Sequence, residues 1–209
     1  MPLQNRITPH GEIEADPARG DFMGNRGILH DANRQLGRRR WAHDNWIICY
    51  TAFRGRHRTV MSPRRYTELF FLDEAVALAA GHRPCYECRR HDYHAWTEAW
   101  RIAHRAARPP RAKEMDRALH LERIDRATRR QQTWSCHLDD LPDGAFVAWE
   151  GAPHLVLGNR FFPWRHSGYT AAKPRLAAEV TVLTPPTSVR TLAAGFRPTL
   201  HATARTPKI

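Results

Sequence analysis

The sequence is poor in cysteine, with only four in 209 residues, and it has almost no lysine. Four cysteines at uneven spacing do not make the framework of a disulfide-rich secreted domain, which concentrates several pairs in a shorter chain. No apolar run approaches the roughly 20 residues that a membrane span requires. The opening Met-Pro-Leu-Gln-Asn-Arg lacks the apolar segment of a signal peptide. We therefore expect a cytoplasmic protein without a membrane anchor.

The chain carries a large excess of positive charge, and nearly all of it is arginine. There are 33 Lys and Arg against 21 Asp and Glu, which gives a formal net charge of +12. Only Lys113, Lys173 and Lys208 are lysines. Such an excess predicts a polyanionic partner, most often nucleic acid, because guanidinium groups bind phosphate and stack on aromatic rings. With 42% hydrophobic residues, the chain also has enough apolar side chains for a folded core.

The first part of the chain is expected to be β-rich. Residues 11–15 alternate like a short strand, and residues 46–53 are apolar on both faces, which predicts a central strand covered on both sides. Residues 66–72 form a further apolar segment. The glycine-rich stretch 19–31 could direct backbone N–H groups and Arg26 at an anion. No helix with a Lys-Ser/Thr signature follows it, however, and a hairpin connection is the preferred interpretation.

The rest of the chain predicts two longer helices and then a β-rich part. An apolar stripe that includes Tyr93, Trp96 and Trp100 indicates the first of these helices. The aromatic stretch 161–169 is expected to be irregular. The expected regular elements are helices at 89–107 and 112–130, strands at 145–149, 154–157 and 180–183, and a final helix at 187–194.

These elements predict an α+β fold with small antiparallel sheets, a helical region around a cysteine pair, and a β-rich C-terminal part. We expect one region over residues 1–107, which holds the cysteine pair, and a second over residues 108–209. The sequence leaves open whether these two regions form one continuous domain.

The stretch 73–92 contains the clearest chemical signal. Asp73 is a good helix N-cap, Gly81 suits the left-handed conformation after a helix, and the proline three residues later prevents the helix from resuming. The chain then turns through Cys85 and Cys88, and two thiols at this spacing are half of a tetrahedral zinc site. A redox pair would lie at the start of a helix that follows a strand, so zinc is the preferred interpretation.

The other zinc ligands must come from elsewhere in the chain. One candidate lies on the predicted strand 46–53 and another in the turn after it. A structural zinc stabilises most when it joins segments that are distant in sequence, which favours these two over local histidines. We therefore predict a Cys₃His zinc site made of Cys49, His57, Cys85 and Cys88. The reserve ligands are His91, His94 and Cys136.

The run Asp-Glu-Ala-Val-Ala-Leu-Ala-Ala-Gly-His-Arg-Pro-Cys-Tyr-Glu-Cys-Arg-Arg resembles the end of the metal-binding domain of the bacterial Ada alkylation-repair family. The resemblance extends over residues 46–90. That family domain binds zinc through four cysteines, one of which accepts a methyl group from a DNA methylphosphotriester. The resemblance matches Cys85 and Cys88 to the second cysteine pair and Cys49 to the first cysteine. The remaining family cysteine has no counterpart, and His57 is the nearest residue able to bind a metal.

Arginine clusters interleaved with aromatic residues are candidate contacts to nucleic acid, and the resemblance favours DNA over RNA. One such cluster, residues 38–40, is followed at once by Trp41, which suits phosphate contacts beside a stacking platform. A solvated loop next to a core tryptophan is an equal alternative. The candidate contacts are Arg38, Arg39, Arg40, Arg54, Arg56, Arg58, Arg64, Arg65, Arg89 and Arg90.

The sequence supports three kinds of function. The preferred one is a nucleic-acid-binding protein in which zinc is mainly structural. The second is a DNA-processing or repair enzyme, either with a zinc-activated Cys49 thiolate or with a metal-dependent hydrolase pair. The third is a protein-interaction module, so the sequence leaves enzymatic activity open. The candidate hydrolase pairs are His30 with Asp31 and His120 with Glu122.

The pattern Leu-Ala-Ala-Gly-x-Arg-Pro occurs twice, at residues 78–84 and at residues 192–198. The first copy continues into the cysteine pair, whereas the second continues as Thr-Leu-His. We interpret the pattern as one way of leaving a helix that the chain uses twice, with a decayed duplication as the alternative.

Overall fold

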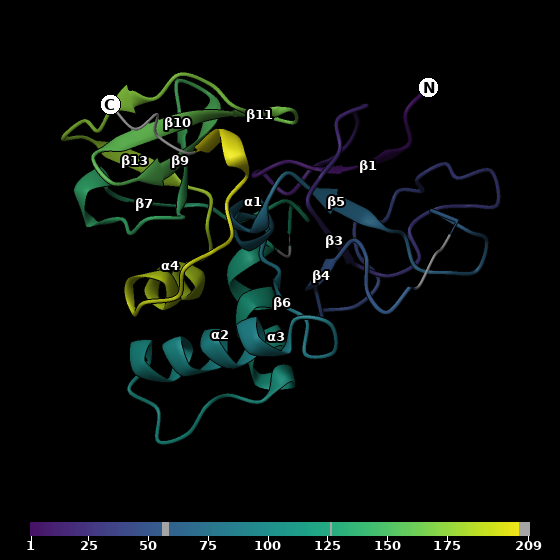
Figure 1. The fold of residues 1–209 in the computed structure, drawn as a ribbon, viewed down its shortest axis with the longest axis horizontal. Coiled ribbons are helices and arrows are strands. Elements are labelled where there is room, and N and C mark those ends of the chain that lie inside the picture. The colour runs from purple at the N-terminus through teal and green to yellow at the C-terminus, as the bar shows by residue number, and fades with distance from the viewer. Residues whose placement is uncertain (56–58, 126, 205–209) are drawn as a thin grey trace.

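The computed structural model describes residues 1–55, 59–125 and 127–204, and it shows an α+β protein built from two sheets and a set of helices (Figure 1). The first sheet has the strand order β2-β1-β5-β3-β4-β6. Its strands are β1 Gln4–Ile7, β2 Ile13–Ala15, β3 Phe22–Asn25, β4 Ile47–Tyr50, β5 Leu69–Phe71 and β6 Arg83–Pro84.

The second sheet lies in the C-terminal half and has the order β11-β10-β9-β8-β13-β7, with β12 paired to β10. All its pairings are antiparallel, as predicted. The aromatic stretch 161–169 is not irregular, because residues 160–165 pair with the preceding strand. The strands are β7 Trp134–His137, β8 Phe146–Trp149, β9 Ala152–Leu157, β10 Arg160–Arg165, β11 Gly168–Tyr169, β12 Lys173–Pro174 and β13 Glu179–Val182.

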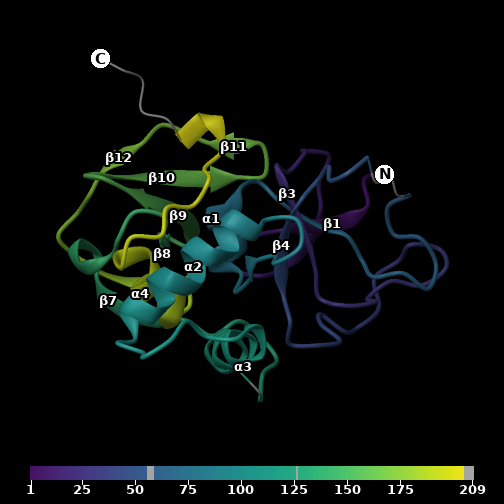
Figure 2. The same ribbon diagram turned by 60° about the horizontal axis from the view of Figure 1, so that its bottom comes forward.

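The longer helices form a layer beside the sheets, with α2 packed on α4 and α3 also in contact with α4. Figure 2 shows α2 crossing in front of the molecule, with α3 seen nearly end-on below it. None of the helices in the described part of the chain has the length and apolar character to cross a membrane. The helices are α1 Glu74–Ala79, α2 Arg90–Ala103, α3 Ala112–Arg123 and α4 Pro186–Ala193, with 3₁₀ turns at Leu138–Asp140 and Ala202–Ala204.

The short helix α1 lies at the centre, between the two sheets, and all six of its residues are buried (Figure 1). The predicted N-cap is present, because Asp73 accepts a hydrogen bond from the Val76 amide at 3.0 Å. The same carboxylate accepts hydrogen bonds from the Tyr169 hydroxyl at 2.7 Å and the His201 amide at 3.0 Å. Asp73 therefore ties the start of this helix to the C-terminal half.

The first sheet is mixed rather than purely antiparallel. β1 runs parallel to β5, and β4 runs parallel to β6. Within the stretch 19–31, which was expected to be a connection, residues 22–25 form strand β3 between β4 and β5. A Phe-Met-Gly-Asn segment carries little strand signal of its own, and pairing on both sides stabilises it.

The hydrophobic core continues across the two predicted regions. One cluster of buried side chains contains Ile48 and Leu78 from the first region together with Phe146 and Leu155 from the second. The predicted helix 112–130 ends earlier, at Arg123. Ile124 is extended, and it bridges to Gln131 in the segment that leads to the second sheet.

Candidate metal centre and basic surface

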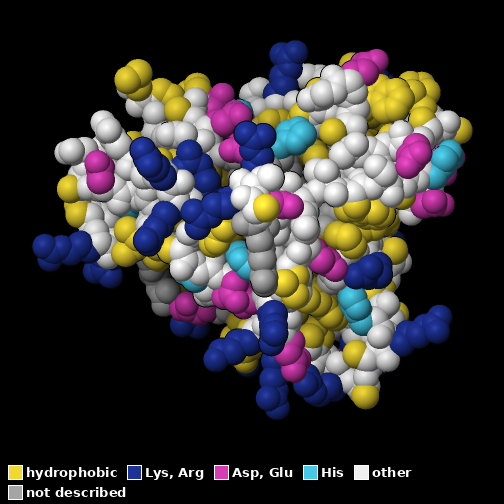
Figure 3. All heavy atoms as spheres, turned by 180° about the vertical axis from the view of Figure 1, so that it is seen from behind, with side chains coloured by type: hydrophobic (Ala, Val, Ile, Leu, Met, Phe, Trp, Pro, Cys, Tyr) yellow, Lys and Arg dark blue, Asp and Glu magenta, His cyan; other side chains and the backbone are white. Residues whose placement is uncertain are grey.

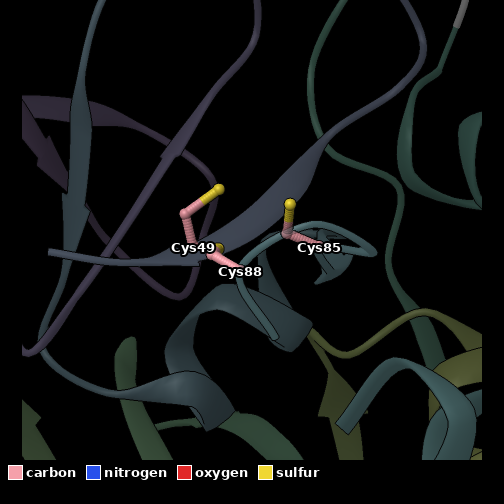
Figure 4. A group of neighbouring side chains, drawn as sticks. All are labelled: Cys49, Cys85 and Cys88. Atoms are coloured by element: carbon pink, nitrogen blue, oxygen red, sulfur yellow. The ribbon is translucent and has the colours of Figure 1, made fainter. Parts of the chain in front are cut away.

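Three thiols from two distant segments meet at the edge of the first sheet. Cys49 lies on β4, whereas Cys85 and Cys88 lie on the turn after β6. Their sulfur atoms all lie within 4.8 Å of one another (Figure 4). β4 and β6 are parallel neighbours, and the Cys85 amide donates to the Ile48 carbonyl at 2.9 Å. This pairing places the cysteine turn beside the strand that carries Cys49.

The exit from α1 fixes the position of the cysteine turn. Gly81 has a φ of 79°, in the left-handed region that glycine adopts without strain. The His82 amide then donates back to the Ala77 carbonyl at 2.9 Å. Two residues before the first cysteine of the turn, Arg83 forms a buried two-pronged ion pair with Asp116 on α3, at 2.7 and 2.8 Å. These backbone and ionic contacts fix the start of the cysteine turn beside β4.

The three thiols share hydrogen bonds in a way that favours one thiolate. Hydrogen bonds from the Cys49 and Cys88 thiols, followed by the amides of Cys88 and Glu87, lower the pKa of Cys85 far below its ordinary value. The same contacts raise the pKa of Cys49, because its thiol donates to these neighbours, and its partial burial adds to the shift. A divalent cation among the sulfurs would compensate the charge of further thiolates.

The sulfur positions fit a tetrahedral metal. Zinc–sulfur bonds of about 2.3 Å put neighbouring sulfurs roughly 3.8 Å apart, so a small contraction of this cluster would suffice. Among residues 1–55, 59–125 and 127–204, only these three cysteines form such a group of potential ligands. The predicted fourth ligand, His57, lies outside the described residues.

The reserve ligands do not join the cluster. Cys136 lies on β7 in the other sheet, opposite Val180 of β13. The side chain of His91 is 98% exposed, and its Nδ1 lies 3.7 Å from the Asp92 carboxylate. His94 packs its ring against Tyr86 and Tyr93. A local Cys₂His₂ site is therefore not assembled in this structure.

The sulfurs line a cavity of about 270 Å³ that the sequence did not predict. Cys49 and Cys88 are half-buried, and Cys85 is only 8% exposed. The other walls come from residues scattered over β3, β4, β5 and the turns beside them, which is why no single motif reports the cavity. They include four aromatic residues and two carboxylates, namely Tyr50, Phe53, Tyr66, Phe70, Glu68 and Glu87.

Most of the described arginines that were predicted to contact nucleic acid are at the surface. Arg40 is half-buried. Figure 3 shows many Lys and Arg side chains gathered on one face, mainly on its left half and along its lower edge. Arg56 and Arg58 lie outside the described residues. The exposed ones are Arg38, Arg39, Arg54, Arg64, Arg65 and Arg90.

Arg89 does not belong with these surface arginines. It is 2% exposed, and its guanidinium forms ion pairs with Glu74 at 2.6 Å and with Asp92 at 2.8 Å. These contacts hold the start of α2 against α1. A buried, fully engaged guanidinium is not available to a phosphate, so the prediction for Arg89 is wrong.

The two candidate hydrolase pairs make structural contacts instead. His30 is buried, with Nδ1 2.7 Å from the Thr67 hydroxyl, and Asp31 accepts hydrogen bonds from amides of its own turn. Glu122 accepts hydrogen bonds from the amide and the hydroxyl of Thr187 at 2.8 and 2.7 Å, which fastens α3 to α4. His120 faces a different surface, a hollow lined by arginines.

Comparisons of the chain with protein-family models, with curated proteins and with solved structures gave no match. The Ada-like resemblance of residues 46–90 is therefore carried by the sequence motif alone. What the protein does must be inferred from its own geometry, which is a three-cysteine group able to hold a metal and a surface rich in arginine.

Proposed function

We propose that the protein binds one zinc ion through Cys49, Cys85 and Cys88, that this zinc is mainly structural, and that nucleic acid is the partner. The observation that carries the proposal is the approach of three thiols to within 4.8 Å from segments 36 residues apart. Thiolate ligands select soft or borderline metals, and zinc is the usual occupant of tetrahedral sulfur-rich sites in a reducing compartment.

The positions of the three thiols support a structural role for the metal. β6 is only two residues long, so few backbone hydrogen bonds hold the cysteine turn to β4. A metal shared by Cys49 and the turn would cross-link this edge of the sheet at little cost in loop entropy. The fourth ligand remains the sequence prediction, His57, with a solvent molecule as the alternative.

Metal content tests this assignment directly. Elemental analysis of the purified wild type should give one zinc per chain. Cys49→Ser, Cys85→Ser and Cys88→Ser should each lose most of the metal, because thiolates dominate the affinity. Cys136→Ser is the matched control and should keep it. Full zinc in the Cys85→Ser and Cys88→Ser variants would overturn the site.

A nucleic-acid partner is supported by the net charge of +12 and by the exposed arginines on the face in Figure 3. Binding to a phosphate backbone releases counterions, so the affinity should fall linearly on a log–log plot against salt, with a slope of about −0.9 per phosphate contacted in duplex DNA. A fluorescence anisotropy titration at several salt concentrations measures this slope. Salt-insensitive binding, or none at low salt, would contradict the proposal.

A second candidate function is methyl transfer to Cys49, as the Ada-like resemblance implies. The observation in its favour is that Cys49 is half-buried and lies in the wall of the aromatic cavity, which an incoming group can enter. Coordination to the metal would hold Cys49 as a thiolate, although its pKa is raised in the metal-free cluster, and its sulfur would attack the methyl carbon of a phosphotriester. The S–C bond forms as the C–O bond breaks, and the phosphodiester leaves with the electron pair.

Mass spectrometry tests this reaction after incubation with methylphosphotriester DNA. The wild type should gain the mass of one methyl group at Cys49, whereas Cys49→Ser should gain none. An unmodified wild type that still contains zinc and binds DNA would remove methyl transfer and leave the structural role intact.

A further inference from the structure

Two buried guanidinium groups lie over the ring of a single buried tryptophan. The Cζ atom of Arg26 is 4.0 Å from the ring centroid of Trp46, and the Cζ atom of Arg123 is 3.7 Å from it. Both arginines are almost fully buried, with exposures of 2% and 1%. Arg26 follows β3 and Arg123 ends α3, so two distant parts of the chain converge here.

Neither of these arginines forms an ion pair with a residue that the structure describes. Arg26 donates to the Gly11 carbonyl at 2.9 Å, and Arg123 donates to the carbonyls of Gly81 and Asp44 at 2.6 and 2.5 Å. One terminal nitrogen of Arg26 and the Nε of Arg123 have no acceptor in the described part of the chain. The other two buried arginines among the described residues, Arg83 and Arg89, pair with carboxylates.

An unpaired buried cation is costly, which makes two of them together unusual. Burial lowers the pKa of Arg26 to about 9, although Glu12 opposes the shift. Burial also lowers the pKa of Arg123, and the charge of Arg26 adds to this effect. Two guanidinium groups therefore lie side by side without a paired carboxylate among the described residues, and an anionic ligand nearby would favour their charged forms.

The buried pair lies beneath an open hollow. Arg26 and Arg123 line a small space of about 30 Å³, which is enough for a water molecule or two but not for a phosphate. A larger hollow of about 380 Å³ adjoins it and shares Arg40, Trp41 and Arg129 with it. Among the described residues, the two spaces are lined by seven arginines and by only two carboxylate residues, Glu12 and Asp44.

We propose that this larger hollow, together with its buried floor, is an arginine recess that binds a phosphate group of a nucleic-acid strand. The exposed guanidiniums of Arg38, Arg39 and Arg129 reach the phosphate oxygens, and the buried pair strengthens the attraction from below. The half-buried Trp41 at the rim offers an aromatic surface beside the phosphate. The proposal rests on nucleic acid as the partner and is independent of the metal.

A strand fits this recess better than a small anion does. The larger hollow is open to solvent and lies on a chain with a net charge of +12, so neighbouring phosphates find further arginines such as Arg130. A single anion would gain little from a hollow of this size unless it were enclosed. Inorganic phosphate and a mononucleotide are therefore expected to bind much more weakly than a strand.

The test compares two pairs of substitutions that remove the same charge. The recess variant is Arg39→Gln with Arg129→Gln, and both side chains are exposed, so the fold should survive. The control is Arg160→Gln with Arg165→Gln, two exposed residues of β10 in the other sheet. Circular dichroism and thermal unfolding check that all variants are folded.

The probe is a labelled single-stranded DNA oligonucleotide, titrated by fluorescence anisotropy with inorganic phosphate and a mononucleotide as competitors. The recess variant should bind roughly tenfold more weakly and lose about 1.4 units of salt slope, as expected for two lost phosphate contacts at about 0.7 each on a single strand. The control should change binding by less than about threefold. Asp44→Asn, which removes a carboxylate from the rim, should tighten binding by about twofold to threefold.

The possible outcomes distinguish binding at the arginine recess from nucleic-acid binding in general. Equal weakening by both double variants would overturn the recess and leave nucleic-acid binding spread over the surface. Competition by phosphate or mononucleotide as strong as by the strand would keep an anion site but overturn the strand as its ligand. No binding of any probe by the wild type at low salt would overturn both proposals.

Discussion

Two helices of this protein end in the same way, and only one of the two exits leads to a possible metal site. At residues 78–84 and 192–198 the chain leaves α1 and α4 through Leu-Ala-Ala-Gly-x-Arg-Pro. Gly81 and Gly195 have φ angles of 79° and 112°. Their amides donate to the carbonyl three residues earlier at 2.9 and 3.0 Å. The local sequence therefore dictates the exit in both places.

Beyond each exit, the path of the chain depends on the surroundings. At the end of the first copy, the chain pairs with β4, and Arg83 forms its buried ion pair with Asp116. In the second copy, Arg197 is exposed, and among the described residues it donates only to carbonyls of its own turn. The motif therefore determines how the chain leaves the helix. The neighbouring strand, which carries Cys49, determines whether a metal site can form there.

The largest effect is expected when the ion pair between Arg83 and Asp116 in the first copy is broken. Asp116→Ala leaves Arg83 buried without a counterion and should lower the free energy of unfolding by about 4 kcal/mol. Arg197→Ala removes an exposed guanidinium and should cost about 0.5 kcal/mol or less. Urea denaturation of both variants measures the difference. Similar losses in the two would mean that the copies are anchored alike.

The two glycines provide the next comparison. A Cβ at position 81 would overlap the side chain of the buried Arg123, whereas no atom of the described residues lies within 4 Å of a Cβ at position 195. Gly195→Ala should therefore cost about 1 kcal/mol from left-handed strain alone. Gly81→Ala should cost about 3 kcal/mol, because the steric overlap adds to the strain. Equal costs, measured by urea denaturation, would contradict this account of the first exit.

Removal of the metal should change hydrogen exchange only around the first copy of the motif. Chelation of the zinc should speed amide hydrogen exchange by at least about tenfold in the turn at 83–88, because the cross-link to β4 is lost. The corresponding segment 197–202 should exchange at an unchanged rate. Exchange mass spectrometry with and without chelator reads both segments in one sample. Uniform acceleration would indicate global destabilisation, and no change would argue against a structural metal.

The smallest effect concerns the variable position of the motif, where His82 and Phe196 are both buried. Burial, followed by the charges of Arg26 and Arg123, lowers the pKa of His82 well below its ordinary value. The unfolded chain therefore binds this proton more readily, with a pKa of about 6.5, so stability falls as the pH drops below that value.

The expected loss from His82 is about 1 kcal/mol for the first pH unit below about 6.5. His82→Phe copies the second exit and should remove this component, while the acid response of the carboxylates remains in both proteins. The measurement is the free energy of unfolding of the two proteins at neutral and mildly acidic pH. An unchanged difference between them would show that His82 is not the source.

Local signals in the sequence predicted the central helix and its exit. Asp73 caps α1 and Gly81 takes a positive φ, because capping and steric preferences act within a few residues. Strands β1, β3 and β10 were not predicted. They are short or contain Gly or Pro, and pairing with distant segments stabilises them.

The candidate sites also combine features that the local sequence indicates with features that depend on distant contacts. The Cys85-x-x-Cys88 motif is local and can be recognised in the sequence. The predicted strand around Cys49 made this residue a candidate third ligand. Arg89 and Arg90 are adjacent and of the same type, so the sequence does not distinguish them. In the structure Arg89 faces the core and Arg90 faces solvent. Of the buried pair beneath the recess, Arg26 was a possible anion contact in the glycine-rich stretch 19–31. Nothing in the local sequence indicates Arg123 or the contact of both arginines with Trp46.

X-ray absorption at the zinc edge counts the sulfur ligands of the metal in the intact protein. The account predicts zinc with three sulfur neighbours at about 2.3 Å and one nitrogen or oxygen neighbour at about 2.0 Å. A Cys49→Ser sample should show two sulfurs or no metal. One sulfur neighbour or none in the wild type, or protein purified without bound metal, would contradict the assignment of Cys49, Cys85 and Cys88 as a metal centre.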